Sequence, residues 1–537
     1  MRFLVLLILL WQVCLPALAV PQPDLTALKL VPAQQGGRLK PLDTVARENV
    51  QQITGKASFH GEDPLWTSLR WMSNPKDAYA EENVECRNLA LKAALGLKAE
   101  QRWFSMNELS ENKKLLDMQA GLDKVSPDAE LSDLDKEFEQ LLMRMQLMAS
   151  IIDGETWKIV PNPKGVEEPW QSLADLKSRL NEPPVAALAT VVGELLRASH
   201  DKDFSKLQSE EPKLAPALSA LGPTPAADKM ALEVHYNQLH PFRMAWIFYA
   251  LGLCPLLFAG RAGKLYWLGL ASTLVGFAYH CYGFYLRCNI SGRAPVTNMY
   301  ESVIWVAFGA VLFALGFEFR SRARVYLLAA LTFAVAALVM ADNLPAVLNP
   351  NINPLMPVLR NNFWLTIHVL TITLSYAAFA LALGLGHMVV WGYAFQNDQK
   401  ERLNTLNKAL YKAIQIGILL LAAGTILGGV WANYSWGRFW GWDPKEVWAL
   451  VALLGYLALL HGRYAGWLGH FGLAAGSILA FMGVMMAWYG VNFILGAGLH
   501  SYGFGTGGGQ YVAVWAGVEG VFVALTTARY RTLRKAR

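Results

Sequence analysis

Apolar residues gather in the second half of this chain, in long stretches separated by short polar segments. From residue 243 onwards the stretches run for about 17–25 residues, which is long enough for one helix to cross a bilayer. We expect nine membrane spans, at approximately 244–260, 265–286, 299–318, 325–342, 363–394, 413–431, 447–462, 466–495 and 510–528. The second half is therefore predicted to be a polytopic helix bundle.

Residues 20–242 are more polar, with helical periodicity only in patches. The segment 128–153 places apolar residues at helical spacing and acidic residues early, as an amphipathic helix does. The segment 36–50 predicts a turn followed by a helix that begins at Asp43 or Thr44. The expected fold class is all-α: a mostly helical domain in residues 20–242, followed by a membrane helix bundle in residues 243–537.

The first nineteen residues have the features of a secretory signal peptide. They carry one positive charge at Arg2, an apolar run, and small residues at Ala17 and Ala19. We expect cleavage after Ala19; the alternative is an anchor helix that stays attached. Under either reading, the domain that follows is predicted to be exported.

Basic residues in the loops divide unequally between the two predicted sides of the membrane. One side carries five, at Arg287, Arg293, Arg360, Arg438 and Lys445. The other carries fifteen, at Arg261, Lys264, Arg320, Arg322, Arg324, Lys400, Arg402, Lys408, Lys412, Arg463, Arg529, Arg531, Arg534, Lys535 and Arg537. The positive-inside rule places the second group in the cytoplasm. This agrees with an exported N-terminal domain, an odd number of spans and a cytoplasmic C-terminus.

Composition narrows the function classes further. Only 16% of the residues are charged, against roughly 25% in a soluble domain, and the net charge is +6. On a membrane protein that charge indicates orientation, so no nucleic-acid partner is expected. None of the five cysteines forms a C-x-x-C pair, which argues against a thiol oxidoreductase or a structural zinc site. Cys281 and Cys288 share one helical face, where packing or a redox-sensitive pair would explain them.

The segment WANYSWGRFWGWDPKEVWAL (431–450) combines five tryptophans with several charged residues. Part of it has a structural explanation, because Asp443 can cap the next helix and Glu446 at the third position can close a capping box. The same logic makes Asn298 a cap and Glu301 its third helical residue. These polar groups are therefore interpreted as helix starts rather than as catalytic acids.

The tryptophans of this segment need a further explanation. Trp431 and Trp448 could belong to an interfacial aromatic belt, which accounts for one or two indoles at a helix end. The belt does not account for Trp436, Trp440 and Trp442, which lie between glycines. Indoles offer a broad apolar face with a polar N–H, and glycines let a flat ligand approach the backbone. The loop 431–446 is therefore predicted to bind a planar aromatic macrocycle.

Histidines near this loop are candidate metal ligands. His368 falls one to two turns into its span from the outer side, and His500 lies in the outer loop after the eighth span. A lone histidine is usually a packing residue, but a pair beside an indole-rich loop fits the axial ligation of haem iron. His461, at the cytoplasmic end of the seventh span, is a third candidate. His280 and His387 are weaker ones.

These residues resemble a known family. WGRFWGWDPKEVWAL resembles the WWD motif of haem-handling proteins. The segments GRAPVTNMYES (292–302), NPLMPVLRNNFWLTIHV (353–369), LLHGR (459–463) and VNFILGAGLHSYG (491–503) narrow the resemblance to the CcsA/ResC family of cytochrome c biogenesis, system II. It covers roughly residues 240–530.

The resemblance implies a function and a site. Such a protein receives haem b from the inner side, moves it to the outer face, keeps its iron reduced, and joins its vinyl groups to the C-x-x-C-H cysteines of apocytochrome c. The chain itself then supplies no catalytic residue, since the apocytochrome provides the thiols. The residues implied to bind haem are His368, His500 and His461, which ligate iron, and Trp431, Trp436, Trp440, Trp442 and Asp443 of the WWD loop.

The resemblance also implies partners and a location. It predicts a ResB/CcsB-like membrane subunit, apocytochrome c, thiol-reducing proteins and membrane lipid as partners, in a bacterial inner membrane. The exported domain resembles the connecting region of forms in which the two subunits are fused. The chain would then be a subunit of a cytochrome c synthetase. The alternatives are a haem transporter or chaperone without attachment activity, and a respiratory haem b protein, which usually pairs its histidines in mid-membrane.

Overall fold

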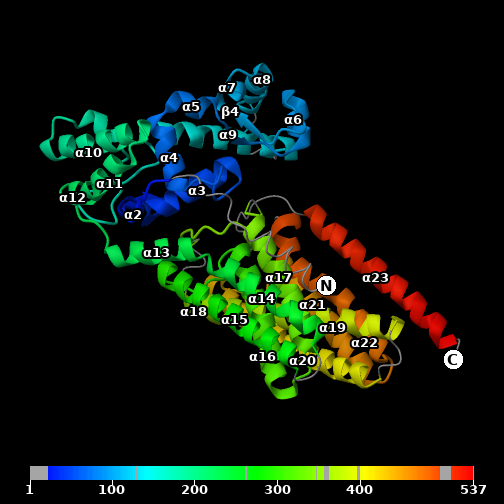
Figure 1. The fold of residues 1–537 in the computed structure, drawn as a ribbon. Coiled ribbons are helices and arrows are strands. Elements are labelled where there is room, and N and C mark those ends of the chain that lie inside the picture. The colour runs from blue at the N-terminus through cyan, green and yellow to red at the C-terminus, as the bar shows by residue number, and fades with distance from the viewer. Residues whose placement is uncertain are drawn as a thin grey trace. The chain divides into compact units, whose positions relative to one another are not determined.

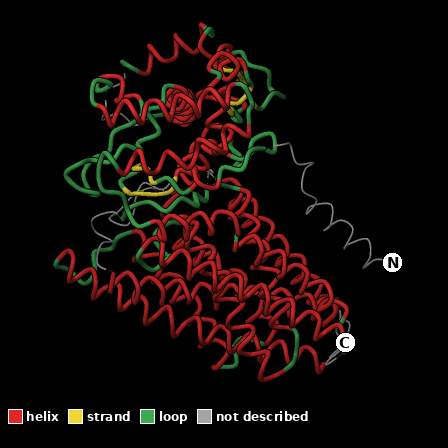
Figure 2. Tube along the Cα trace, turned by 60° about the vertical axis from the view of Figure 1, so that its left-hand side comes forward, coloured by secondary structure: helices red, strands yellow, loops and turns green. Residues whose placement is uncertain are grey.

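The structure is a computed structural model that describes residues 22–124, 126, 131–259, 263–345, 347–355, 362–395, 400–495 and 509–535. The chain divides into two compact units, Met1–Gln238 and Leu239–Arg537. Helices dominate both (Figures 1 and 2), which confirms the all-α fold class. The predicted signal peptide and His500 lie outside the described residues.

The first unit is built mainly from short helices. Its strands form two antiparallel hairpins, β1 (Pro32–Gln35) with β2 (Arg38–Pro41), and β3 (Glu82–Glu85) with β4 (Trp103–Ser105). Its helices are α2 (Thr26–Lys29), α3 (Leu42–Thr54), α4 (Pro64–Ser73), α5 (Pro75–Ala80), α6 (Leu89–Leu95), α7 (Met106–Ser110), α8 (Lys113–Leu122), α9 (Asp133–Ile152), η1 (Ala174–Ser178), α10 (Pro183–His200), α11 (Phe204–Glu210), η2 (Glu211–Lys213), α12 (Leu214–Ser219) and α13 (Ala227–Leu239), which ends one residue past the unit boundary.

Two sequence predictions for this unit can be compared with these elements. Gly36 and Gly37 both have positive φ, at 61° and 78°, and close the β1–β2 hairpin, so the predicted turn belongs to a hairpin that we did not expect. The helix after it begins at Leu42. The predicted amphipathic helix is α9, whose N-cap is Ser132 with a capping box to Asp135, rather than a residue near 128.

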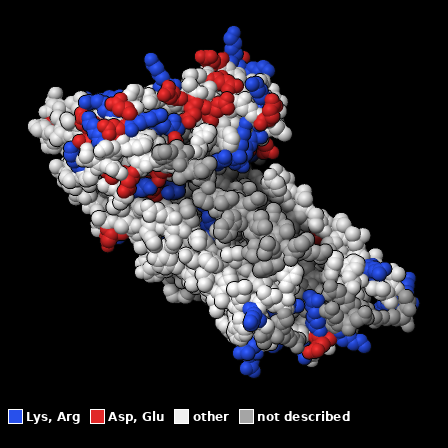
Figure 3. Space-filling model, viewed as in Figure 1, with Lys and Arg blue, Asp and Glu red and all other residues white. Residues whose placement is uncertain are grey.

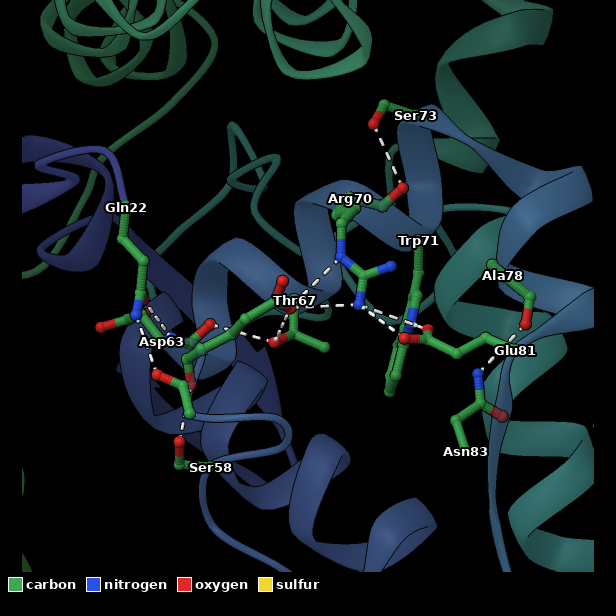
Figure 4. Close-up of polar contacts among 12 residues, drawn as sticks. Gln22, Ser58, Asp63, Thr67, Arg70, Trp71, Ser73, Ala78, Glu81 and Asn83 are labelled. Carbon is green, nitrogen blue, oxygen red and sulfur yellow. Dashed lines mark hydrogen bonds and ion pairs between the residues drawn. The ribbon is translucent and has the colours of Figure 1, made fainter. Parts of the chain in front are cut away.

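Polar contacts fix α4 within the first unit (Figure 4). Arg70 Nη2 lies 3.0 Å from a carboxylate oxygen of Glu62 and 3.0 Å from one of Glu81, and the Trp71 indole N–H donates to Glu81 at 2.7 Å. Trp71 itself is fully buried in the apolar core of this unit. The carboxylates of Glu62 and Glu81 therefore stabilise the position of α4, whose Trp71 is part of the core.

The second unit is a bundle of long helices (Figure 1). They are α14 (Pro241–Phe258), α15 (Lys264–Ser291), α16 (Met299–Ser321), α17 (Val325–Asn343), α18 (Asn362–Trp364), η4 (Leu365–Val369), α19 (Leu370–Phe395), α20 (Lys400–Trp436), α21 (Pro444–Tyr464), α22 (His470–Met485), η5 (Met486–Leu495) and α23 (Gly509–Lys535). The segments η4 and η5 are π-helices, continuous with α19 and α22 respectively.

Eight helices of the described chain are long and apolar enough to cross a membrane. They match every predicted span except 265–286, which forms α15. This helix packs along α14 with very little space between the backbones: a Cβ at Gly269 would lie 2.5 Å from Leu256, and one at Gly276 would lie 2.7 Å from Tyr249. Its tyrosines, His280 and Arg287 lower its mean hydropathy. The predicted helix is therefore present in the bundle, although it is less apolar than the other eight.

Exposed basic residues of the bundle gather towards one end (Figure 3). On the face shown in Figure 3, the surface of the second unit is largely uncharged, with Lys and Arg gathered towards one end. Helix directions explain this, because the basic segments 320–324, 400–412 and 463 lie where α16 ends, α20 begins and α21 ends. The opposite ends of these three helices are the ones that meet the cavity described below.

Candidate functional site

A cavity of about 140 Å³ lies at one end of the bundle. Its lining comes from the segment 296–302 at the start of α16, from η4 and the first turns of α19, from the last turns of α20, from the loop after it, from the start of α21, and from η5. Most of the exposed lining is apolar. The helix ends that meet here are distant in sequence, so only the folded bundle creates the cavity.

Two π-helices contribute to this lining. Leu365 and His368 come from η4, and Trp488 and Asn492 come from η5. π-Helical turns are rare, and inside α-helices they occur frequently at functional sites. The second one ends at Leu495, directly before the segment that contains His500.

His368 lines the cavity with a defined orientation. Its Nδ1 lies 2.9 Å from the carbonyl oxygen of Gly424, which can only accept a hydrogen bond, so Nδ1 carries the proton. In the neutral ring the lone pair is then on Nε2, and a carbonyl that fixes the tautomer in this way is the usual companion of a metal-binding histidine. Gly428 allows the ring to approach α20, since a Cβ there would lie 2.6 Å from His368 Cε1.

Trp431 packs beside this histidine. The two ring centroids are 5.7 Å apart in an edge-to-face arrangement, and Trp431 is 8% exposed. It forms a small buried cluster with Val296 and Leu365. Its indole N–H is buried and makes no hydrogen bond within the described structure. A buried donor without a partner is costly in an apolar environment, which marks this part of the cavity as suited to a ligand with an acceptor.

The remaining predicted tryptophans divide into two groups. Trp436, which is the last residue of α20, and Trp440 both line the cavity, together with Phe439, whose ring packs over Gly429. Trp442 does not line it: this side chain is 71% exposed and its backbone has φ 58°, which turns it away while its ring keeps an edge contact of 5.9 Å with Trp440. The indole segment is also less of a loop than predicted, because α20 continues to Trp436.

Asp443 and Glu446 act as helix-starting residues, as predicted. Asp443 accepts the backbone N–H of Lys445 at 3.0 Å and completes a capping box with Glu446. The Glu446 carboxylate accepts the N–H groups of Gly441 at 2.8 Å and Asp443 at 3.2 Å. Glu446 lines the cavity and Asp443 does not. Asp443 therefore shapes the loop, and its carboxylate is directed to the backbone.

The second predicted cap, Asn298, lies in the segment 296–302 of the cavity wall. Asn298 Oδ1 accepts the N–H of Glu301 at 2.8 Å, as expected. Glu301, 1% exposed, pairs with Arg287, 0% exposed, at 2.7 Å and also accepts the N–H of Thr297 at 2.7 Å. This buried ion pair fixes the start of α16, where the chain meets the cavity.

Lys445 and Asn492 are among the lining residues that sequence reasoning missed. Lys445 was counted only as a loop charge, yet it lines the cavity, and its Nζ lies 3.5 Å from Asn492 Oδ1. Asn492 in turn donates to the carbonyl of Trp488 at 3.1 Å, and the Trp488 indole donates to Ser302 at 2.8 Å. The signal for Lys445 was its place two residues after a capping aspartate, which holds it beside the indoles.

The other histidine candidates lie elsewhere. His461 is in the last turn of α21, is exposed, and has Nδ1 2.8 Å from the carbonyl of Leu457. It is sixteen residues from Lys445 on the same helix, or about 24 Å at 1.5 Å per residue. The structure therefore does not bring His461 to the cavity. His500 lies outside the described residues, so its predicted pairing with His368 stays a prediction.

The two histidines of lower rank have protein partners inside the bundle. His280 is fully buried, with Nδ1 3.1 Å from the Tyr249 hydroxyl and Nε2 3.0 Å from the carbonyl of Ile304. His387 has Nε2 2.7 Å from a carboxylate oxygen of Glu519. In the described residues no cluster of three or more His, Cys, Asp or Glu could hold a metal ion, and the four described cysteines are not in disulfides.

Comparison with known proteins defines the class of this bundle. A family model described as cytochrome C assembly protein matches residues 296–500, which include every segment of the cavity wall. The chain is similar to the cytochrome c biogenesis protein CcsA of Prochlorococcus marinus (strain MIT 9312), at 37% identity over 257 residues, covering 41% of this chain and 79% of that protein. The bundle is thus that of a multi-pass membrane protein of cytochrome c assembly.

A second relative matches most of the chain. It is protein NrfI of Wolinella succinogenes, which is 29% identical over 505 residues. The match covers 89% of this chain and 54% of NrfI, so the chain spans about half the length of that relative. From these similarities, the chain belongs to the CcsA/ResC family of system II cytochrome c biogenesis proteins.

Proposed function

We propose that this protein binds haem at the cavity between η4, α20, α21 and η5, and there presents it for attachment to apocytochrome c. The observation that carries the proposal is His368, an imidazole held by Gly424 with its lone pair on Nε2, in a cavity lined by Trp431, Trp436 and Trp440. An imidazole beside flat apolar rings suits a haem whose iron takes an axial nitrogen ligand.

His500 is proposed as the second axial ligand. It follows η5, whose residues Trp488 and Asn492 line the cavity, by a few positions in sequence. His461 is proposed to hold haem at an earlier stage, nearer the cytoplasm. Its place at the far end of α21 from Lys445 suits a separate site rather than a third ligand of the same iron.

The proposed orientation puts the cavity on the outer side of a bacterial inner membrane. The basic segments lie at the ends of α16, α20 and α21 that are remote from the cavity, and the positive-inside rule assigns such segments to the cytoplasm. Residues 20–242 would then be exported with the outer loops, and the ResB/CcsB-like subunit, apocytochrome c and thiol-reducing proteins would be met on that side.

In this proposal, the chain contributes to haem attachment by positioning the haem, and it supplies no acid, base or nucleophile. Each apocytochrome thiol adds across a haem vinyl group: the S–H bond breaks, a C–S bond forms at one vinyl carbon, and the hydrogen goes to the other, with no net oxidation. Holding the ring so that both vinyl groups meet the thiols converts an encounter into a positioned reaction.

The absorption spectrum of the purified protein tests the proposal. We expect haem b to co-purify with the wild type, to be lost or oxidised in His368→Gly, and to return when imidazole is added. His200→Gly, which changes an exposed histidine of the first unit, is the control and should leave the spectrum unchanged. A wild type without haem, or an unchanged spectrum in His368→Gly, would refute the site.

Attachment is tested separately by coexpression with an apocytochrome and the partner subunit in cells that lack other maturation systems. Covalent haem on the apocytochrome is the expected product. If haem binds normally and none is attached under these conditions, the protein is a transporter or chaperone. Mid-span histidines that already contact Tyr249 and Glu519 argue against the respiratory haem b alternative.

A further inference from the structure

Lys445 is the unusual group in the cavity wall. Its side chain reaches a cavity whose exposed lining is mostly apolar, and its single hydrogen bond in the described structure is the long one, 3.5 Å, to Asn492 Oδ1. No ion pair of Lys445 occurs among the residues that the structure describes. A cation in such a place is costly unless an anion compensates it.

The Asp443 carboxylate offsets part of the Lys445 charge, but the carboxylates near the cavity are held in place by other contacts. Asp443 caps α21 and Glu446 accepts two backbone N–H groups of the preceding loop. Glu301, which precedes the lining residue Ser302, pairs with Arg287 and accepts from Thr297. Each of these acids has a structural task that a move towards Lys445 would undo.

Other features of the same cavity also favour an anion. The buried Trp431 indole, 8% exposed, lines the cavity with an N–H that has no acceptor in the described structure. The N-termini of α16 and α21 both meet the cavity, through Asn298 and Lys445 among others, and helix N-termini favour negative charge. An ammonium, an unpaired N–H and two helix N-termini together describe a site for a carboxylate.

We propose that Lys445, supported by Asn492, binds a propionate carboxylate of haem and so determines which way round the ring lies in the cavity. This proposal rests on the proposed function, because Lys445 can orient haem only if the cavity binds haem. The two propionates sit on neighbouring pyrroles and the two vinyl groups on the other two. Fixing the propionate edge against α21 therefore directs the vinyl edge away from α21.

The chemistry of the ligand gives a direct test. Binding of ferrous protoporphyrin IX is compared with binding of its dimethyl ester, in which both propionates are neutral, to the full-length protein in detergent. A charge-assisted hydrogen bond corresponds to roughly a tenfold to hundredfold preference of the wild type for the free acid. Lys445→Met keeps the length of the side chain and should abolish that preference, and Lys445→Arg should retain most of it.

The visible spectrum separates this role from a structural one. In Lys445→Met the axial-ligand bands should match the wild type, because His368 is unchanged, while the preference for free acid is lost. If the wild type binds both compounds equally, or if Lys445→Met still prefers the free acid, the assignment of Lys445 is wrong and the haem site stands. If the wild type binds neither compound, the proposed function fails and this assignment with it. The wild-type comparison needs no variant, so it decides the matter even if Lys445→Met does not fold.

Discussion

Two sets of polar residues in the bundle differ in how completely they are paired: Arg287, Glu301 and His280 form the first set, and Lys445 and Trp431 of the cavity wall form the second. In the first set, Arg287 and Glu301 pair at 2.7 Å with at most 1% exposure, and His280 has a partner at each ring nitrogen. In the second set, the Lys445 ammonium has one long hydrogen bond and the Trp431 indole N–H has none in the described residues. We infer that the first set holds the scaffold and that the second set is available to the proposed ligand.

The largest effect expected from this comparison comes from breaking the scaffold pair. Arg287→Met leaves Glu301 buried without its cation, which should lower the free energy of unfolding by about 3–5 kcal/mol. The melting temperature in detergent measures this. The double variant Arg287→Met with Glu301→Gln removes both charges, keeps an acceptor for Thr297, and should recover most of the loss. Equal instability of the single and double variants would show that charge is not what matters there.

The second effect concerns haem binding rather than stability. Gly428→Ala puts a Cβ 2.6 Å from His368 Cε1, so the imidazole must move away from α20 and from the carbonyl of Gly424. Overpacking of this kind costs about 1–3 kcal/mol, which corresponds to roughly tenfold weaker haem binding. Gly455→Ala, in α21, meets nothing within 4 Å and is the matched control. Haem titration of the two variants should separate them, and equal affinities would contradict the close packing of His368.

Local signals predicted part of this site well. The caps at Asn298 and Asp443 depend on residues within a few positions, and the structure has both. His368 was placed beside the indoles from its depth in a span, and it does pack against Trp431. The sequence therefore predicted those features that depend on neighbouring residues or on the length of the apolar stretches.

Other parts depended on tertiary structure. The π-helices η4 and η5 change which side chains face inward. A prediction that assumes regular α-helices cannot include this change. Trp440 and Trp442 are two residues apart and their rings touch, but only Trp440 lines the cavity, because Trp442, with its positive φ, is turned to the surface. Lys445 becomes notable only when the acids around it are seen to be engaged.

A smaller effect should distinguish those two tryptophans. Trp440→Ala removes a cavity wall and should weaken haem binding by roughly fivefold, consistent with about 1 kcal/mol for an aromatic contact. Trp442→Ala removes a side chain that is 71% exposed and should change affinity by less than twofold. Haem titration of both variants checks this. A larger loss for Trp442→Ala would mean that Trp442 contacts the ligand, against its outward position.

The smallest expected effect concerns paired and unpaired charged residues in the first unit. There, Arg70 compensates Glu62 and Glu81, while Glu211 is buried, accepts the N–H of Leu28 at 3.2 Å, and makes no ion pair within the described chain. Burial raises the pKa of the Glu211 carboxyl above its ordinary value, and its hydrogen bond to Leu28 only partly opposes that shift.

The sign of the pH dependence follows from this shift. A carboxyl with a raised folded-state pKa contributes stability that is fully present below its unfolded-state pKa, about 4.3, and is lost as pH rises through the folded-state value. Hydrogen exchange of peptides covering α2, compared between wild type and Glu211→Gln at each pH, should therefore show similar protection at acidic pH and greater protection of the variant near neutrality. Protection that differs by the same factor at every pH would mean that the Glu211 carboxylate is stabilised in some other way, and that its burial without an opposite charge does not destabilise this unit.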